Sequence, residues 1–285
     1  MCSEHFQGRL RDAVETSLCE YVSSSDIIAV AVSGGKDSTA LLDITSDWAR
    51  TRNIKLFAIC IDEGIEGYRK KTVTFLRKFC ESKDIKLRVI SFKEEFGKTL
   101  DECLADGMGV RACTLCGTLR RYLLNSHSRK MGATKILFAH NRDDELQTFF
   151  MNLFSGNLPQ LSRKGELIGI IDHPLFVVRL KPLIRVPERA LATYALLNYP
   201  IPDEECPYLE ESSRVESRKF INELESKCPG SKSRIMNTYL EEILPPLKQG
   251  APNLQNKLKV CTTCGEPTSG ETCKACEFRK TFSLH

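Results

Sequence analysis

The stretch Asp26-Ile27-Ile28-Ala29-Val30-Ala31-Val32-Ser33-Gly34-Gly35-Lys36-Asp37-Ser38 decides how this chain of 285 residues folds. Its first part, residues 26–32, is apolar from Ile27 on, which is typical of a central strand buried on both faces. Two glycines then end the strand, and a helix is expected from Lys36 to about Arg50. The order of strand, glycine turn and helix predicts an α/β fold with a ligand-binding turn at its first crossover.

The same alternation continues on both sides of this stretch. A helix is expected before it, at 9–24, and further strands and helices follow it at 55–62 (strand), 66–83 (helix), 87–92 (strand), 114–131 (helix), 135–140 (strand) and 142–155 (helix). Strands that alternate with helices predict a parallel sheet with helices on both faces.

After residue 160 the pattern becomes mostly helical. We expect a strand at 176–180, helices at 187–198, 212–227 and 232–244, and an end to the compact core at Leu244-Pro245-Pro246. The chain then divides into an N-terminal helix over 1–25, a main domain over 26–250 and a cysteine-bearing tail over 255–285.

Composition limits the possible classes of protein. The chain has no run of about 18 apolar residues, so we expect no membrane span. Its 13 cysteines are an odd number and no signal peptide is visible, which argues against a secreted disulfide framework and favours the cytoplasm. The net charge of +4 is too small to establish a nucleic-acid partner, although it permits a local basic face.

The turn Ser33-Gly34-Gly35-Lys36-Asp37-Ser38 carries the chemistry expected of a phosphate site. Glycines let the backbone come close to a ligand, and the N–H groups at the following helix start favour an anion. Lys36 adds positive charge, and Asp37 is suited to orient a magnesium ion. The motif differs from a Walker A loop, because its lysine is followed by aspartate. A glycine turn with an ordinary helix cap is the alternative.

These six residues resemble the signature S-G-G-x-D-S of the PP-loop ATP pyrophosphatases. The resemblance implies that ATP and Mg²⁺ are bound and that ATP is cleaved between its α and β phosphates, with AMP passing to a substrate oxygen. It also implies that Asp62, at the end of the second strand, and Ala139 meet the nucleotide; a turn-capping role is the alternative for Asp62.

A cluster of acids follows the strand at 135–140, in His140-Asn141-Arg142-Asp143-Asp144-Glu145. Such carboxylates bind magnesium or help to remove a proton, although acids are also common at helix starts. The same family has a matching H-x-x-D-D segment beside its ATP. On this resemblance, Asp144 is the expected catalytic carboxylate and Arg120 the expected contact with phosphate.

Three further cysteines form a candidate sulfur site. Cys113 and Cys116 open a helix that carries Arg120 and Arg121, a setting that lowers thiol pKa values, and Cys206 stands before Pro207. The pair alone fits zinc, redox chemistry or a structural role. Three thiolates suit a 4Fe–4S cluster with one open iron, whereas a catalytic persulfide on one cysteine, with Cys206 resolving a disulfide, is the cluster-free alternative.

The tail contains Cys261, Cys264, Cys273 and Cys276 in the spacing C-x2-C-x8-C-x2-C, which fits a closed tetrahedral Zn²⁺ site. Together with the PP-loop and the three cysteines, it resembles the tRNA 2-thiouridine synthetases of the TtuA and Ncs type, related to TtcA. That family usually begins with a second zinc finger. Here only Cys2-Ser3-Glu4-His5 matches its second half, so we expect no N-terminal zinc.

The resemblance implies a tRNA sulfurtransferase with Cys113 and Cys206 at its reacting centre. ATP adenylates O2 of a tRNA uridine, and sulfur then replaces the activated oxygen to give 2-thiouridine. The expected donor is a ubiquitin-like carrier or free sulfide, and we also expect a homodimer. Another PP-loop ligase or amidotransferase leaves the three cysteines unexplained, and a zinc-bearing RNA-binding protein without catalysis leaves the PP-loop unexplained.

Basic residues that could contact tRNA phosphates are scattered over the chain. An ordinary charged surface is the alternative for each of them. They are Arg120, Arg121, Arg129, Lys130, Arg163, Lys164, Arg179, Lys181 and Arg185.

Overall fold

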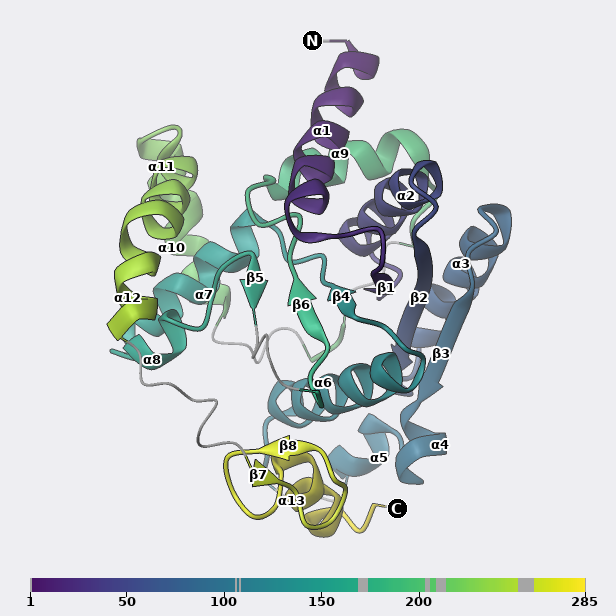
Figure 1. Cartoon of the computed structure of the whole chain (residues 1–285). Helices are drawn as coiled ribbons and strands as arrows, with labels where there is room; N and C mark the ends of the chain where they lie inside the picture. The colour runs from purple at the N-terminus through teal and green to yellow at the C-terminus, as the bar shows by residue number, and fades with distance from the viewer. Residues whose placement is uncertain are drawn as a thin grey trace.

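A six-stranded sheet forms the centre of the computed structural model, which describes residues 2–105, 107, 109–168, 174–202, 206–208, 214–250 and 259–284 (Figure 1). The strand order is β3-β2-β1-β4-β6-β5. Its parallel members are β1 (Ile27–Ala31), β2 (Lys55–Asp62), β3 (Leu87–Ser91), β4 (Lys135–Leu137) and β6 (Val178–Leu180). The predicted parallel α/β sheet is therefore confirmed. The antiparallel edge strand β5 (Leu167–Ile168) was not predicted, because two residues are too short to show a period.

Helices cover both faces of this sheet. One face carries α1 (Ser3–Tyr21), α2 (Lys36–Thr51), α3 (Arg69–Ser82) and α9 (Glu188–Asn198), and the other carries α4 (Phe92–Phe96), α5 (Leu100–Ala105) and α6 (Ala112–Lys130). Strand β1 shows why: Ile28 and Val30 join the core of the first face, whereas Ala29 joins the core under α6. Its continuous apolar sequence therefore reflects burial on both sides.

A third group of helices packs beside the sheet around its own apolar core, with Phe150, Met236 and Tyr239 at its centre (Figure 1). Its members are α7 (Arg142–Phe154), α8 (Leu158–Leu161), α10 (Arg214–Lys227), α11 (Ser231–Thr238), the π-helix η1 (Tyr239–Ile243) and α12 (Leu244–Gly250).

The helix expected to end at residue 244 continues further, although Leu244 is the last buried residue among 244–250 and only Leu247 beyond it packs against the core. The chain stays helical through Leu244–Gly250, with Pro245 and Pro246 in the first turn of α12. These prolines follow a π-helical segment directly, so they lie inside a continuous helical run, and a π-bulge is one of the irregularities that accompany an interrupted helical hydrogen-bond ladder. The preceding π-helical segment, Tyr239–Ile243, carries the chain into this turn.

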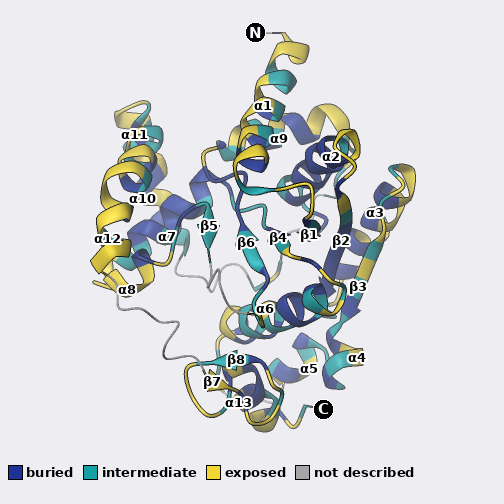
Figure 2. Cartoon of the chain, in the orientation of Figure 1, coloured by how far each residue is buried: buried dark blue, intermediate teal, exposed yellow. Residues whose placement is uncertain are grey.

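The tail packs against α6 with its strands β7 (Lys259–Val260) and β8 (Pro267–Thr268) and its helix α13 (Lys274–Thr281). Phe278 and Phe282 belong to the same buried cluster as Leu119 and Leu123 of α6, and Figure 2 shows buried residues in dark blue in both α6 and α13. The tail is thus fastened to the body by a shared core. The proposed division between 26–250 and 255–285 falls partly within 251–258, outside the described residues.

No helix among the described residues is long and apolar enough to cross a membrane, as the sequence led us to expect.

Candidate functional site

The turn from β1 to α2 is built so that only glycine fits at its first bend. Gly34 has a φ of +86°, and a Cβ there would lie 2.9 Å from the carbonyl oxygen of Thr72 in α3. A side chain at this position would therefore be both strained and in collision. The Ser33 N–H donates to Ser38 Oγ at 3.1 Å, which closes the turn from within.

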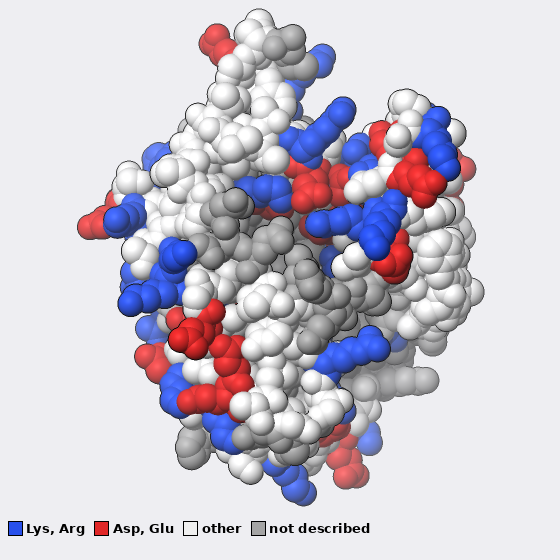
Figure 3. Space-filling view, turned by 180° about the vertical axis from the view of Figure 1, so that it is seen from behind, with Lys and Arg blue, Asp and Glu red and all other residues white. Residues whose placement is uncertain are grey.

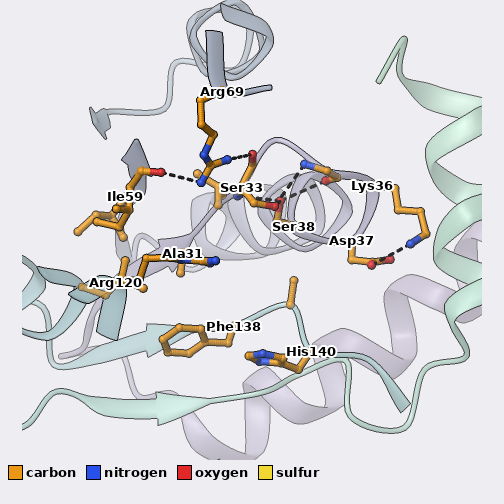
Figure 4. Close-up of a pocket in the computed structure, with 15 residues that line it drawn as sticks. Ala31, Ser33, Lys36, Asp37, Ser38, Ile59, Arg69, Arg120, Phe138 and His140 are labelled. Atoms are coloured by element: carbon orange, nitrogen blue, oxygen red, sulfur yellow. Dashed lines mark hydrogen bonds and ion pairs between the residues drawn. The ribbon is translucent and has the colours of Figure 1, made fainter. Parts of the chain in front are cut away.

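This turn forms one wall of a pocket of about 250 Å³. Gly35 and Ala139 are among the residues that line it, and Figure 4 shows Phe138 and His140 across the pocket from Ser33, Asp37 and Ser38. Apolar side chains of Ile59, Ile61 and Leu124 also line it, together with Arg69 and Arg120. A helix N-terminus facing an apolar wall suits a nucleotide, with its phosphates on the turn and its base on the wall.

Two expected nucleotide contacts lie outside this lining. The Asp62 carboxylate accepts a hydrogen bond from the Gly64 N–H at 2.9 Å and so shapes the turn after β2. Asp144 lies in the first turn of α7, where its side chain and that of Asn141 form a reciprocal cap. The structure thus gives Asp62 a hydrogen bond of the kind expected for its alternative role, and its contact with the nucleotide stays a prediction.

Asp37 and Asp144 are the carboxylates suited to hold a cation at the pocket. Burial raises the pKa of Asp37 to about 6, with Lys36 opposing the shift and Asp144 adding to it. Asp37 Oδ1 is buried and has no hydrogen-bond partner among the described residues. A divalent cation would supply the partner that this oxygen lacks, so the residues present fit Mg²⁺. The carboxylate of the neighbouring Asp143 instead forms an ion pair with Lys232, whose Nζ lies 2.5 Å from Asp143 Oδ1.

A buried ion network that the sequence did not reveal supports the floor of the pocket. Glu63 binds Arg69, and its Oε1 also lies 3.2 Å from Arg120 Nε. Arg69 donates to the carbonyl oxygens of Ser33 at 2.8 Å and Ile61 at 2.6 Å, which joins the ends of β1 and β2. Arg120, expected at a phosphate, lines the pocket from α6 while Glu63 orients it.

We predict that Glu63→Gln destabilises the protein by about 3–5 kcal/mol, because it leaves the positive charge of Arg69 buried without its counter-ion. The side chains of Glu63 and Arg69 are only 2% and 4% exposed. Urea unfolding measures the effect. Glu223→Gln is the control, since its partner Lys227 is on the surface and the change should cost less than about 1 kcal/mol. Equal losses for the two variants would refute the prediction.

The structure brings the three candidate sulfur residues to one place beside this network. Cys113 and Cys116 lie one turn apart at the start of α6, and Cys113 Sγ is 3.7 Å from the carbonyl oxygen of Tyr208, two residues after Cys206. Cys116 Sγ lies 4.0 Å from Glu63 Oε1. The sulfur site therefore adjoins the nucleotide pocket through Glu63 and Arg120.

The expectation of low thiol pKa values at this site was wrong for two of the cysteines. Burial, followed by the charge of Glu63, raises the pKa of Cys116 to about 11 and outweighs the opposing effect of Arg120. Burial also raises the pKa of Cys206. The sequence showed the helix start and the cation but not Glu63, which approaches from the end of β2.

The tail cysteines form a site for a single metal ion. The ligand atoms of Cys261, Cys264, Cys273 and Cys276 all lie within 4.8 Å of one another, and they are the only such group found among the described residues. Cys264 Sγ and Cys273 Sγ are 3.6 Å apart. A tetrahedral zinc ion with Zn–S bonds of about 2.3 Å separates its ligands by about 3.8 Å, so the fit is close.

Cys113, Cys116 and Cys206 are not drawn together into such a compact group in the part of the chain that the structure describes. A cube of iron and sulfide holds its thiolates farther apart than a single ion does, so the wider spacing suits a cluster better than zinc. At the N-terminus, Cys2 Sγ lies 2.9 Å from His5 Nδ1 and both side chains are exposed. That pair supplies two ligands, half of a tetrahedral site.

Cys264→Ser is predicted to remove one zinc ion per chain and to unfold the tail, because a structural zinc contributes on the order of 10 kcal/mol of folding free energy. Metal analysis and hydrogen exchange over residues 259–284 measure the two effects. Since α13 shares a core with α6, exchange should also rise in α6, while β1 and α2 stay protected. Cys2→Ser is the control and should leave the zinc content unchanged. Absence of zinc from the natively purified wild-type protein would contradict the prediction.

The turn Ser33–Ser38 follows the first strand of the mostly parallel sheet and opens onto a pocket fit for a nucleotide. This arrangement is that of the PP-loop class of ATP-binding proteins. The family model described as "PP-loop domain" matches residues 3–202. The tRNA 2-thiolation protein NcsA of Haloferax volcanii is 34% identical over 98% of this chain and 92% of its own length. The tRNA-5-methyluridine(54) 2-sulfurtransferase of Thermus thermophilus is 31% identical over 98% of this chain and 84% of its own.

Among solved structures, the U34-tRNA thiolase NcsA from Methanococcus maripaludis with its [4Fe-4S] cluster superposes with a TM-score of 0.83 and 31% identity. The match covers 98% of this chain and 89% of that one. The chain belongs to the PP-loop family and, within it, to the tRNA 2-thiolation sulfurtransferases. The resemblance stated from the sequence is confirmed.

Proposed function

We propose that this enzyme adenylates a tRNA uridine with ATP at O2 and then replaces the activated oxygen with sulfur, giving 2-thiouridine. One observation carries the proposal: Arg120 lines the nucleotide pocket, and its ion-pair partner Glu63 lies 4.0 Å from Cys116 of the three-cysteine site. The two steps act on neighbouring atoms of one base, so their sites have to adjoin.

The first step uses the residues of the PP-loop pocket. Backbone N–H groups of Gly35 and its neighbours at the start of α2, together with Lys36, hold the phosphates of ATP. Asp37 and Asp144 are proposed to hold Mg²⁺, which would neutralise charge on the phosphates. Arg120 is proposed to stabilise the charge that develops at the α-phosphate when the uridine O2 attacks and pyrophosphate leaves.

The second step uses the cysteines at the start of α6. Cys113, Cys116 and Cys206 are proposed to hold a 4Fe–4S cluster, as the named relative from Methanococcus maripaludis holds one. When bound by three thiolates, such a cluster supplies an open iron that presents sulfide for attack on C2. Glu63 keeps Arg120 between the two sites, where it can balance the charge on the departing AMP. The proposed sulfur donor is a ubiquitin-like carrier or free sulfide.

A test combines the purified protein, under anaerobic conditions, with ATP, sulfide and unmodified tRNA. The account expects AMP and pyrophosphate to form only when tRNA is present, and mass analysis of the nucleosides to show one oxygen replaced by sulfur in uridine. AMP formation with an amine or ammonia incorporated in place of sulfur would identify another PP-loop ligase instead. Binding of tRNA without AMP formation would identify a binding protein.

A further inference from the structure

Many basic side chains among the described residues are paired with acids. On the face in Figure 3, Lys and Arg side chains alternate with Asp and Glu, so surface charge alone marks no RNA site there. Four of the nine residues considered for RNA contact are neutralised by ion pairs: Arg120, Arg129, Lys181 and Arg185 bind Glu63, Glu266, Glu145 and Glu241. The lysine of the PP-loop is paired in the same way, and one of its partners has no role in the function proposed above.

Two carboxylates hold the ammonium group of Lys36. Its Nζ lies 3.0 Å from Glu188 Oε1 and 3.1 Å from Asp37 Oδ2. Figure 4 shows the Lys36 amine beside Asp37, on the side of the loop away from Ser33. Glu188 reaches this point from the start of α9, 152 positions further along the chain. A phosphate group that takes the charge of Lys36 therefore has to compete with both acids.

The fold fixes the place from which Glu188 acts. It is the first residue of α9, and its backbone N–H donates to Asp143 Oδ2 of α7 at 3.0 Å. Farther along α9, Leu191 and Tyr194 are buried in the core that α2 shares, and the Tyr194 hydroxyl donates to Asp43 Oδ2 at 2.8 Å. Acids are common at helix starts, because they favour the helix dipole. That preference does not account for the contact with the lysine of the PP-loop.

Glu188 also has a second cation within reach. Arg218 Nη2 of α10 lies 3.8 Å from the same Oε1 that binds Lys36. The side chains of Lys36 and Glu188 are 35% and 34% exposed, so a ligand can approach their contact. A lysine ammonium has three donors on a flexible stem, which lets it turn from one acceptor to another. Lys36 can therefore move to a phosphate while Glu188 keeps Arg218 as a partner.

Negative charge exceeds positive charge around Lys36. Glu188 and Asp37 share its single ammonium group, and the carboxylate of Asp144 lies close enough to act on the same place. After burial, which Lys36 opposes, the charges of Asp144 and then Glu188 contribute to raising the pKa of Asp37 to about 6. Such an excess repels the triphosphate of ATP on its own and favours a triphosphate that arrives with a divalent cation.

We propose that Glu188 is a positioning residue that makes ATP binding depend on Mg²⁺, by competing with the phosphates of ATP for Lys36. The proposal deepens the adenylation step and rests on the function proposed above. Mg²⁺ held by Asp37 and Asp144 would replace the positive charge that these acids receive from Lys36. The ammonium is then free to leave Glu188 for the phosphates, and nucleotide without Mg²⁺ is bound poorly.

The test measures ATP binding by calorimetry for the full chain without tRNA, in buffer free of divalent ions and in buffer with Mg²⁺. Without Mg²⁺, Glu188→Gln should bind ATP about fivefold more tightly than the wild type, which corresponds to about 1 kcal/mol, the upper range for a partly exposed ion pair. It should gain about fivefold less affinity than the wild type when Mg²⁺ is added. Glu241→Gln is the control and should bind ATP like the wild type. Its carboxylate also lies 3.0 Å from a cation of another element, Arg185, and neither residue lines the nucleotide pocket.

A second comparison shows whether Glu188 acts through Lys36. In a Lys36→Met background, Glu188→Gln should no longer tighten ATP binding without Mg²⁺, because the ammonium for which the two anions compete is gone. Tightening of equal size in that background would mean that Glu188 acts by its charge alone, and it would overturn the proposal.

Thermal unfolding separates this role from a structural one. Glu188→Gln and Glu241→Gln each lose one partly exposed ion pair, so their melting temperatures should fall by similar small amounts. Weaker or unchanged ATP binding by Glu188→Gln without Mg²⁺, or a much lower melting temperature than that of Glu241→Gln, would also overturn the proposal. If the wild-type protein binds no ATP under either condition, the proposed function itself fails. Mg²⁺-dependent ATP binding by the wild type with an unaffected Glu188→Gln refutes the role of Glu188 alone.

Discussion

Replacing Cys113, Cys116 or Cys206 with serine is expected to abolish the visible iron absorption and tRNA thiolation together, to the same extent at all three positions. Each residue is proposed as one ligand of a single cluster, so the loss of any one ligand should remove the whole cluster. The loss of activity should exceed the about 10- to 100-fold that follows when only a supporting partner of a metal ligand is removed. Absorption spectra and thiouridine yield after anaerobic reconstitution measure the two effects.

The matched control is Cys228→Ser, whose thiol is exposed like that of Cys113 but lies at the end of α10, in the separate helical group. It should keep both the iron and the activity. A persulfide mechanism predicts a different pattern, in which iron-free protein remains active and a sulfur adduct can be trapped on one cysteine.

Asp37→Asn is expected to reduce AMP formation by about 100- to 1000-fold, the usual effect of removing one group that stabilises charge in a transition state. The fold should survive. In the free protein, burial raises the pKa of Asp37 to about 6, above its unfolded value, so its carboxylate costs stability above about pH 6. That cost fades as the pH falls toward the unfolded pKa. The variant should therefore melt at the same or a higher temperature at pH 7, while AMP release is lost.

Asp47→Asn is the control for this change. Asp47 lies on the same helix and also pairs with basic residues: its Oδ2 is 3.1 Å from Arg11 Nη1, and its Oδ1 is 3.5 Å from Arg50 Nη1. It does not line the pocket. Its AMP formation should be normal. Ser38→Ala should also lose AMP release. The side chain of Ser38 is buried, not exposed as the sequence suggested, and its Oγ closes the PP-loop by accepting a hydrogen bond from the Ser33 N–H. Normal turnover in Asp37→Asn would contradict the proposed magnesium site.

Features that depend on neighbours in sequence were predictable. The buried strand before Ser33, the glycine turn and the four spaced cysteines of the tail each follow from a local pattern, and the structure confirms the expected sheet and groups the tail cysteines. The boundaries of β2, Lys55–Asp62, were also as expected because its apolar run is bounded by charged residues.

Features that depend on distant partners were not predictable. Glu63 meets Arg120 across 57 positions of sequence, and Arg129 meets Glu266 across 137, so no local period marks either pair. The expectation of low pKa values for Cys116 failed for the same reason, because the sequence does not show that Glu63 lies beside the cysteine site. It also explains why nine basic residues looked alike until the structure showed which of them have acidic partners.

The central claim is that this enzyme uses ATP activation and cluster-bound sulfur together on one uridine of its tRNA substrate. The most direct test is single-turnover thiolation with sulfide and ATP, comparing anaerobically reconstituted protein with the same preparation freed of iron. The account predicts one AMP for each 2-thiouridine in the reconstituted protein and no 2-thiouridine in the iron-free protein. Full thiolation by iron-free protein would contradict it.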